Sequence, residues 1–183
     1  FVIISSNSYQ ICEGDSLEIT LDSIFSEVLW NTGSTEESIY ATDEGNYYAQ
    51  VTDKFGCKSN SNSIYIKEYE NPVADFTYYG NCINNPTIFQ NNSSSTDSIQ
   101  LLEWVVQSNK FYGQSFEYIF KNSQQYDIKL LITTNKGCTD SLVKFINIDL
   151  NPIAEYSFYT SNLIDYDSLV SVSYTHLTLP TSH

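Results

Sequence analysis

The sequence predicts an all-β protein built from tandem antiparallel β-sandwiches. Apolar and polar residues alternate over short stretches, which is the pattern of strands that bury one face. Turn residues separate these stretches at intervals of about 8 to 12 residues, and no stretch shows the period of an amphipathic helix. A series of Cys, Trp, Tyr and Cys also occurs twice in the 183 residues. The chain is therefore expected to contain two units of one kind.

The first unit is predicted to span residues 8–69. Its strands are indicated by alternating apolar residues in the stretches 17–21, 28–30, 39–41, 47–51 and 64–66. The apolar run at the start of the chain is like the runs that close the two units. Residues 1–7 are therefore expected to be the last strand of a preceding domain.

The second unit is predicted to span residues 70–150. Its strands are indicated by same-face apolar residues in the stretches 74–78, 87–89, 102–106, 116–120 and 126–132. Asn71-Pro72 stands at the entry to this unit and returns as Asn151-Pro152. Proline suits the start of a strand because it donates no ladder hydrogen bond. Residues 151–171 are therefore expected to be the truncated start of a further unit.

The tail 172–183 is predicted to lie outside the natural protein. Residues 172–182 are similar to one translated reading frame of a sequencing-library adaptor. Both histidines, His176 and His183, lie in this tail, so the rest of the chain contains none. The alternative is a genuine strand and loop.

The composition argues against several classes of function. The formal charge is −14, and all eight basic residues are lysines, so nucleic acid and anionic membrane surfaces are poor partners. No stretch approaches the length of a membrane span, so no membrane insertion is expected. No loop has the spaced acidic ligands of an EF-hand, and no cofactor or metal site is expected, although binding of a hydrated divalent cation stays open.

An enzymatic role is not expected. Catalytic triads and most general bases need histidine, which the natural part of the chain lacks. The 22 acidic residues always offer some pair that resembles a glycosidase dyad. Because nothing in the sequence selects one pair, no catalytic residue is assigned.

Four cysteines in two equivalent sets suggest disulfides and an oxidising compartment. Of the three possible connectivities, Cys12–Cys57 with Cys82–Cys138 is favoured because each unit then closes on itself. The alternative is four buried free thiols. The favoured pairing requires Cys12 to lie near the start of its edge strand, since the two turns of a simple sandwich can lie at opposite ends.

Several motifs resemble bacterial immunoglobulin-like repeats and PKD (polycystic-kidney-disease) domains. The segments 12–16, 30–33 and 45–57 are similar to the CxGxS opening, the WSTG turn and the GTYTVTVTDxxGC ending of the former. The segments 72–77 and 126–141 are similar to the PxADFT opening and the YxVxLxVTxxxGCxDS ending of the latter. The WDFGDG centre of PKD domains is absent after Trp104, so a role of that acidic turn does not carry over.

The phase of the aromatic residues along the predicted strands suggests their roles. Trp30 and Trp104 are expected to be core anchors between two sheets. Tyr47 and Tyr126 have the inward phase and the position of the immunoglobulin tyrosine corner, whose hydroxyl bonds to the backbone. The aromatic residues out of phase with the core are candidates for surface contact; they are Tyr48, Tyr78, Tyr79, Phe111 and Tyr112.

The resemblance, which covers residues 12–158, also implies a function. It is greatest to the arrays of large surface and gliding-associated proteins of Bacteroidetes that are exported by type IX secretion. It implies a secreted or surface-bound, non-catalytic spacer or adhesion module. Its partners would be neighbouring repeats in the same chain and an unknown protein or glycan. The alternative is a carbohydrate-binding appendage of a secreted polysaccharide-degrading enzyme, with Tyr78, Tyr79 and Tyr112 as ligand contacts.

Overall fold

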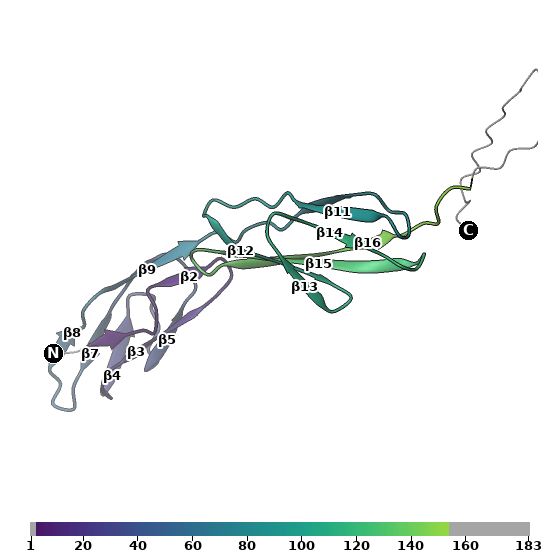
Figure 1. Ribbon diagram of the computed structural model, residues 1–183. Coiled ribbons are helices and arrows are strands. Elements are labelled where there is room, and N and C mark those ends of the chain that lie inside the picture. Colours follow the sequence, from purple (N-terminus) through teal and green to yellow (C-terminus); the bar gives the residue numbers. More distant parts are fainter. Residues whose placement is uncertain (1–2, 154–183) are drawn as a thin grey trace, which may run out of the picture.

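The computed structural model describes residues 3–153, and within them the chain forms sixteen strands and no helix. All strand pairs are antiparallel except one. Figure 1 shows two β-sandwiches joined end to end. The predicted fold class is confirmed. No helix in the described part of the chain could cross a membrane.

The first sandwich packs one three-stranded sheet against a longer layer. The three-stranded sheet has the order β1-β3-β5, with β1 at Ile4–Ser5, β3 at Leu17–Leu21 and β5 at Ser38–Ala41. The facing layer has the orders β2-β9-β6 and β4-β7-β8. Its strands are β2 (Gln10–Cys12), β4 (Glu27–Trp30), β6 (Gly45–Tyr47), β7 (Ala49–Thr52), β8 (Lys58–Asn60) and β9 (Ile64–Tyr69). Only Tyr48 separates β6 from β7, so the two parts form one continuous layer.

Strand β1 corrects the expectation for residues 1–7. Ile4 pairs with Leu21 of β3, and its side chain is buried in the core of the first sandwich. A closing strand of a preceding domain would pair within that domain instead. In the described residues, this run is therefore the opening strand of the first sandwich.

The second sandwich has a three-stranded and a four-stranded sheet. The first has the order β10-β11-β14, with β10 at Phe76–Tyr79, β11 at Pro86–Asn91 and β14 at Ser115–Ile119. The second has the order β13-β12-β15-β16. Its strands are β12 (Ile99–Val106), β13 (Asn109–Tyr112), β15 (Gln125–Thr134) and β16 (Thr139–Asn147). Strand β15 alternates strictly, burying Tyr126, Ile128, Leu130 and Ile132 toward the facing sheet.

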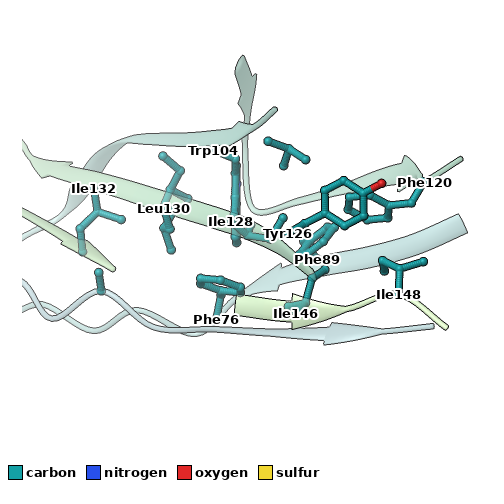
Figure 2. Packing of buried hydrophobic residues seen from close by; sticks show 13 residues of the cluster. Phe76, Phe89, Trp104, Phe120, Tyr126, Ile128, Leu130, Ile132, Ile146 and Ile148 are labelled. Carbon is teal, nitrogen blue, oxygen red and sulfur yellow. The ribbon is translucent and has the colours of Figure 1, made fainter. Parts of the chain in front are cut away.

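Each sandwich has its own hydrophobic core. The buried residues of the first core lie between Ile4 and Ile66, and those of the second lie between Ala74 and Ile148. Figure 2 shows the second core, where Trp104 lies among aromatic rings. Its ring centroid is 5.3 Å from that of Phe76. Since the two clusters share no residue, each sandwich has the means to fold around its own core.

Lys144 closes one open edge of the second sandwich. It lies on β16, donates to Asp75 Oδ1 at 2.7 Å and also to the carbonyl oxygen of Phe76. Its ammonium lies 4.8 Å from the centre of the Phe76 ring. The ion pair lowers the pKa of the Asp75 carboxyl below its ordinary value. Lys144 thus ties the edge strand β16 to the opposite sheet at the start of β10.

Residues 151–153 have no regular structure. The remainder of the expected further unit, and the whole adaptor-like tail 172–183, lie outside the described residues.

Candidate functional site: the junction of the two sandwiches

A disulfide joins the two sandwiches. It links Cys12, at the end of β2, to Cys138, in the turn between β15 and β16, and their Cα atoms lie 5.5 Å apart. The two residues are 126 positions apart in the sequence. The bond therefore connects two domains rather than closing one of them.

This bond corrects the predicted pairs Cys12–Cys57 and Cys82–Cys138. Cys12 pairs in parallel register with Tyr69, the last residue of β9. Cys57 lies twelve residues earlier in the chain, directly before β8. Twelve residues of extended chain at about 3.3 Å each would separate these ends by on the order of 40 Å. A disulfide tolerates a Cα separation of only about 4.4–6.8 Å. Cys57 is exposed and Cys82 is half-buried, and both are free thiols.

The parallel pairing of β2 with β9 decides the position of Cys12. The favoured Cys12–Cys57 pairing requires Cys12 to lie near the start of its edge strand, close to the Cys57 turn. In the structure, Gln10, Ile11 and Cys12 instead run alongside Lys67, Glu68 and Tyr69 in the same direction. Short strands carry no sequence signal for parallel or antiparallel pairing, so this feature could not be predicted.

Three further contacts hold the junction, and none was predicted. Gln10 Nε2 donates to the carbonyl oxygen of Lys136 at 3.1 Å. The ammonium of Lys136 lies 5.0 Å from the centre of the Tyr69 ring, within cation–π range. Asn71 Nδ2 donates to the carbonyl oxygen of Glu13 at 2.8 Å. The disulfide is thus one part of a contact that also includes polar and aromatic side chains.

Acidic residues line a hollow beside the junction. It has a volume of about 420 Å³ and is bordered by Glu13, Glu44, Glu68, Glu70 and Asn71. Among residues 3–153, however, no group of three or more histidine, cysteine or acidic side chains has the arrangement of a metal site.

One of these carboxylates is bound by its neighbours. Glu44 accepts hydrogen bonds at 2.5 Å from both Lys67 Nζ and the Tyr65 hydroxyl. The hydrogen bond from Lys67, and to a smaller extent that from Tyr65, lowers the pKa of Glu44 from 4.5 to about 2. Glu44 is therefore an ion-pair partner of β9 rather than a free acid in the hollow.

The two predicted corner tyrosines lie at equivalent places in the two sandwiches. The Tyr47 hydroxyl donates to the carbonyl oxygen of Asp43 at 2.8 Å, and the Tyr126 hydroxyl donates to that of Asn122 at 3.2 Å. Both rings are buried. Each tyrosine thus fixes the turn four residues before it, which is a structural role.

The two tryptophans lie in the cores. Trp30 is 1% exposed and Trp104 is 0% exposed. Each indole nitrogen donates to a backbone carbonyl, that of Glu36 at 2.8 Å and that of Gly113 at 2.9 Å respectively. Neither ring is available to a ligand.

The candidate contact residues Tyr78, Tyr79 and Tyr112 do not form one surface. Tyr78 pairs in register with the buried Phe89 and so points toward the rim of the core, whereas Tyr79 is 60% exposed on the other face of β10. Tyr112 is 59% exposed on β13, which lies next to β14 at the edge opposite β10. Its hydroxyl donates to Glu103 Oε2 at 3.2 Å. These rings therefore do not make a shared sugar-binding platform.

The remaining two candidates differ from each other. Tyr48 is about half exposed at the interruption between β6 and β7. Phe111 packs against the second core and stacks on Phe116, with ring centroids 4.7 Å apart. Tyr48 thus remains a surface residue, and Phe111 is a structural one.

Comparison with known proteins shows similarity of structure alone. No protein-family model matches the sequence, and no curated protein matches it. Among solved structures, the PKD1 domain of Vibrio anguillarum Epp is 19% identical, with a TM-score of 0.43, and covers 46% of this chain and 100% of its own. The PKD1 domain of the Vibrio cholerae metalloprotease PrtV is 23% identical, with a TM-score of 0.40, and covers 43% of this chain and 98% of its own. The fibronectin(III)-like modules of Clostridium thermocellum CbhA are 13% identical, with a TM-score of 0.45, and cover 80% of this chain and 94% of their own.

Proposed function

We propose that this chain is a non-catalytic spacer or adhesion segment of a large exported bacterial surface protein. In this role its two sandwiches are successive links of a tandem array. The array would hold a more distal part of the protein away from the cell, or present it to a protein or glycan on another surface.

The observation that carries this proposal is the covalent bond across the junction. Cys12 and Cys138 belong to different sandwiches, each of which has its own core. A bond in this place adds no contact to either core, but it restricts how the sandwiches move relative to each other. Restricted bending is useful in a spacer, because it keeps the ends of the array apart.

The charge of the chain supports an extended, soluble array. The net charge is −14, and three of the lysines form ion pairs with Glu44, Glu103 and Asp75. Like charge along successive links opposes their folding back on one another.

The disulfide also supports a location outside the cytoplasm. Disulfides persist in oxidising compartments and are rare where thiol reductants are abundant. We therefore place the protein at the outer surface or in the secreted fraction.

Small-angle X-ray scattering of the chain with its disulfide intact tests the proposal. We expect an elongated particle whose scattering fits a single arrangement of the two sandwiches. In the Cys12→Ser/Cys138→Ser double variant, both sandwiches should remain folded while the scattering requires a range of arrangements. A compact particle with the sandwiches folded onto one another would contradict the spacer role.

A further inference from the structure

Cys12 occupies a defined position where the chain leaves the first sandwich. The residue after it, Glu13, donates from its backbone nitrogen to the carbonyl oxygen of Tyr69 at 2.9 Å. The chain then turns, with the nitrogen of Asp15 donating to the carbonyl oxygen of Cys12 at 2.9 Å. Gly14, at the third position of this turn, has a positive φ of 83°.

Cys82 occupies the same position in the second sandwich. The nitrogen of Ile83 donates to the carbonyl oxygen of Asp149 at 2.9 Å, and Cys82 forms a parallel bridge with Asp149. The nitrogen of Asn85 donates to the carbonyl oxygen of Cys82 at 3.3 Å. Asn84, at the third position of the turn, has a positive φ of 60°, a conformation that asparagine tolerates well. The parallel bridge, the two backbone hydrogen bonds and the positive φ of the Cys12 site are thus repeated around Cys82.

Cys57 and Cys138 share a second position, in the turn before β8 of the first sandwich and in the turn before β16 of the second. The nitrogen of Asp53 donates to the carbonyl oxygen of Cys57 at 3.0 Å, and that of Thr134 donates to the carbonyl oxygen of Cys138 at 2.8 Å. The side chains of Asp53 and Thr134 each accept a hydrogen bond from the backbone nitrogen of the cysteine, at 2.8 and 3.2 Å. The glycine before each cysteine has a positive φ. These two turns are therefore copies of one another.

The two positions lie at opposite ends of each sandwich. Cys12 and Cys82 lie where the chain leaves each domain, beside Tyr69 and Asp149 respectively. Cys57 and Cys138 lie at the other end, in the turns before β8 and β16. The observed disulfide joins the leaving end of the first sandwich to the entering end of the second. Cys82 therefore lies at the leaving end of the second sandwich in the place from which Cys12 makes its bond.

The linker that leaves each sandwich is also repeated. Asn71 follows Tyr69 by two residues and contacts the Cys12 turn through Glu13. Asn151 follows Asp149 by two residues and accepts a hydrogen bond from Asn85, in the Cys82 turn, at 2.9 Å. A proline follows each asparagine. The chain thus begins to leave the second sandwich across the same loop as it leaves the first.

We propose that Cys82 forms a disulfide with the turn cysteine of a sandwich that follows in the same protein, and that Cys57 accepts the matching bond from a sandwich that precedes. Each bond forms between two thiols, which release two protons and pass two electrons to a disulfide oxidant. That oxidant is reduced to two thiols. The disulfides of the array thus connect its domains in series and leave no domain closed on itself. This inference rests on the proposed array.

A lengthened chain tests the inference. Residues 1–150 are followed directly by a second copy of residues 71–150, so that a sandwich with the Cys138 turn follows the Cys82 site. The added copy carries Val143→Ile, an exposed position in the same tryptic peptide as its Cys138. The Cys138 peptide of the added copy is then heavier than the Cys138 peptide of the original sandwich. The oxidised protein is alkylated, digested without reduction and analysed by mass spectrometry.

We expect the heavier peptide linked to the peptide that contains the first Cys82, and the lighter one linked to the peptide that contains Cys12. The second link reports that the original junction has formed in the same molecules. An alkylated Cys82 beside an intact Cys12–Cys138 bond would overturn the inference. The shape of the chain in solution does not depend on this result, so the spacer proposal stands or fails separately.

If the added copy does not fold, a second measurement tests whether Cys82 and Cys57 pair preferentially. The Cys57→Ser and Cys82→Ser variants of the original chain each keep one free thiol, and they are mixed in equal amounts in a glutathione redox buffer. We expect dimers that join Cys82 to Cys57 to exceed the amount given by random pairing. Random or smaller amounts of these mixed dimers, or no dimers, would contradict the complementarity of the two positions.

Discussion

At the scale of single residues, side chains that bond to the backbone fix the turns of this protein. Tyr47 and Tyr126 each reach the carbonyl four residues before them, and Asp53 and Thr134 each hold the turn that presents a cysteine. These bonds recur in both sandwiches although their sequences differ. The recurrence indicates that the two sandwiches use the same turns at equivalent places.

Replacing Tyr47 by phenylalanine should destabilise the first sandwich by about 1 kcal/mol, the typical net contribution of a hydrogen bond between neutral groups. The bond that is lost is the one to the Asp43 carbonyl. Urea unfolding followed by tyrosine and tryptophan fluorescence measures the change. Tyr48→Phe is the matched control, because its ring is about half exposed, and it should change stability little. An equal loss of unfolding free energy in both variants would show that the Tyr47 hydrogen bond to the Asp43 carbonyl is not the cause.

The pH dependence of stability should report on Glu44. Its carboxyl has a folded-state pKa of about 2, against an ordinary value of 4.5. A lowered pKa means that the charged form is favoured in the folded state, so the contribution is complete above pH 4.5 and is lost as the pH falls toward 2. Glu44→Gln should therefore lower the melting temperature at pH 7, and the difference from the parent protein should shrink across this window.

Scanning calorimetry between pH 2 and pH 7 gives the two curves. Glu37→Gln, at another exposed carboxylate of the same sandwich, is the control and should run parallel to the parent protein. A difference between Glu44→Gln and the parent that stays constant through the acid range would show that the ion pair with Lys67 does not stabilise the fold.

At the scale of elements, the pairing of one three-residue strand with the end of β9 decides where Cys12 lies. Strand β2 runs parallel to β9, and this places Cys12 at the far end of the sandwich from Cys57. The strands around it are antiparallel and follow the alternation of the sequence. The geometry that selects the disulfide thus depends on an element too short to show a pattern.

The turn before β8 should be sensitive to the loss of its glycine. Gly56 has a φ of 83°, so alanine would be strained there although its Cβ would meet no atom within 4 Å. We expect Gly56→Ala to destabilise the first sandwich by roughly 1–2 kcal/mol, the cost of a left-handed conformation for a residue with a side chain. Gly45, in β6, also has free space but no positive φ. Gly45→Ala should therefore be neutral or slightly stabilising, and chemical denaturation would separate the two.

At the scale of the whole molecule, residues 3–153 form two separate cores and one covalent junction. The disulfide closes a loop across 126 positions, and it should stabilise the folded chain mainly by restricting the unfolded one. Gln10, Lys136 and Asn71 make further contacts at this junction.

The Cys12→Ser/Cys138→Ser variant should keep both sandwiches but lose up to about 5 kcal/mol of total unfolding free energy, the chain-entropy value for a loop of this size. Guanidinium titration with circular dichroism measures the loss and shows whether the domains then unfold separately. The Cys57→Ser/Cys82→Ser variant is the control, because these thiols are unpaired in this chain. If the control lost as much stability as the test variant, the disulfide would not be the cause.

The sequence by itself determined the fold class and most residues of both cores, but not the place of Ile4 in the first core. Alternation placed Trp30, Trp104, Tyr47 and Tyr126 on inward faces, because a strand with one buried face has a period of two whichever neighbour it pairs with. The repeated cysteine motifs likewise indicated two related units.

Only the tertiary structure decided which cysteines meet and which strand opens the first sandwich. Both depend on the pairing of very short strands, β1 with β3 and β2 with β9. Pairing direction and partner are set by how the whole sandwich closes, and a run of two or three residues carries too little pattern to specify them. For the same reason, the scattered tyrosines could be recognised as exposed, but their distribution over opposite edges could not.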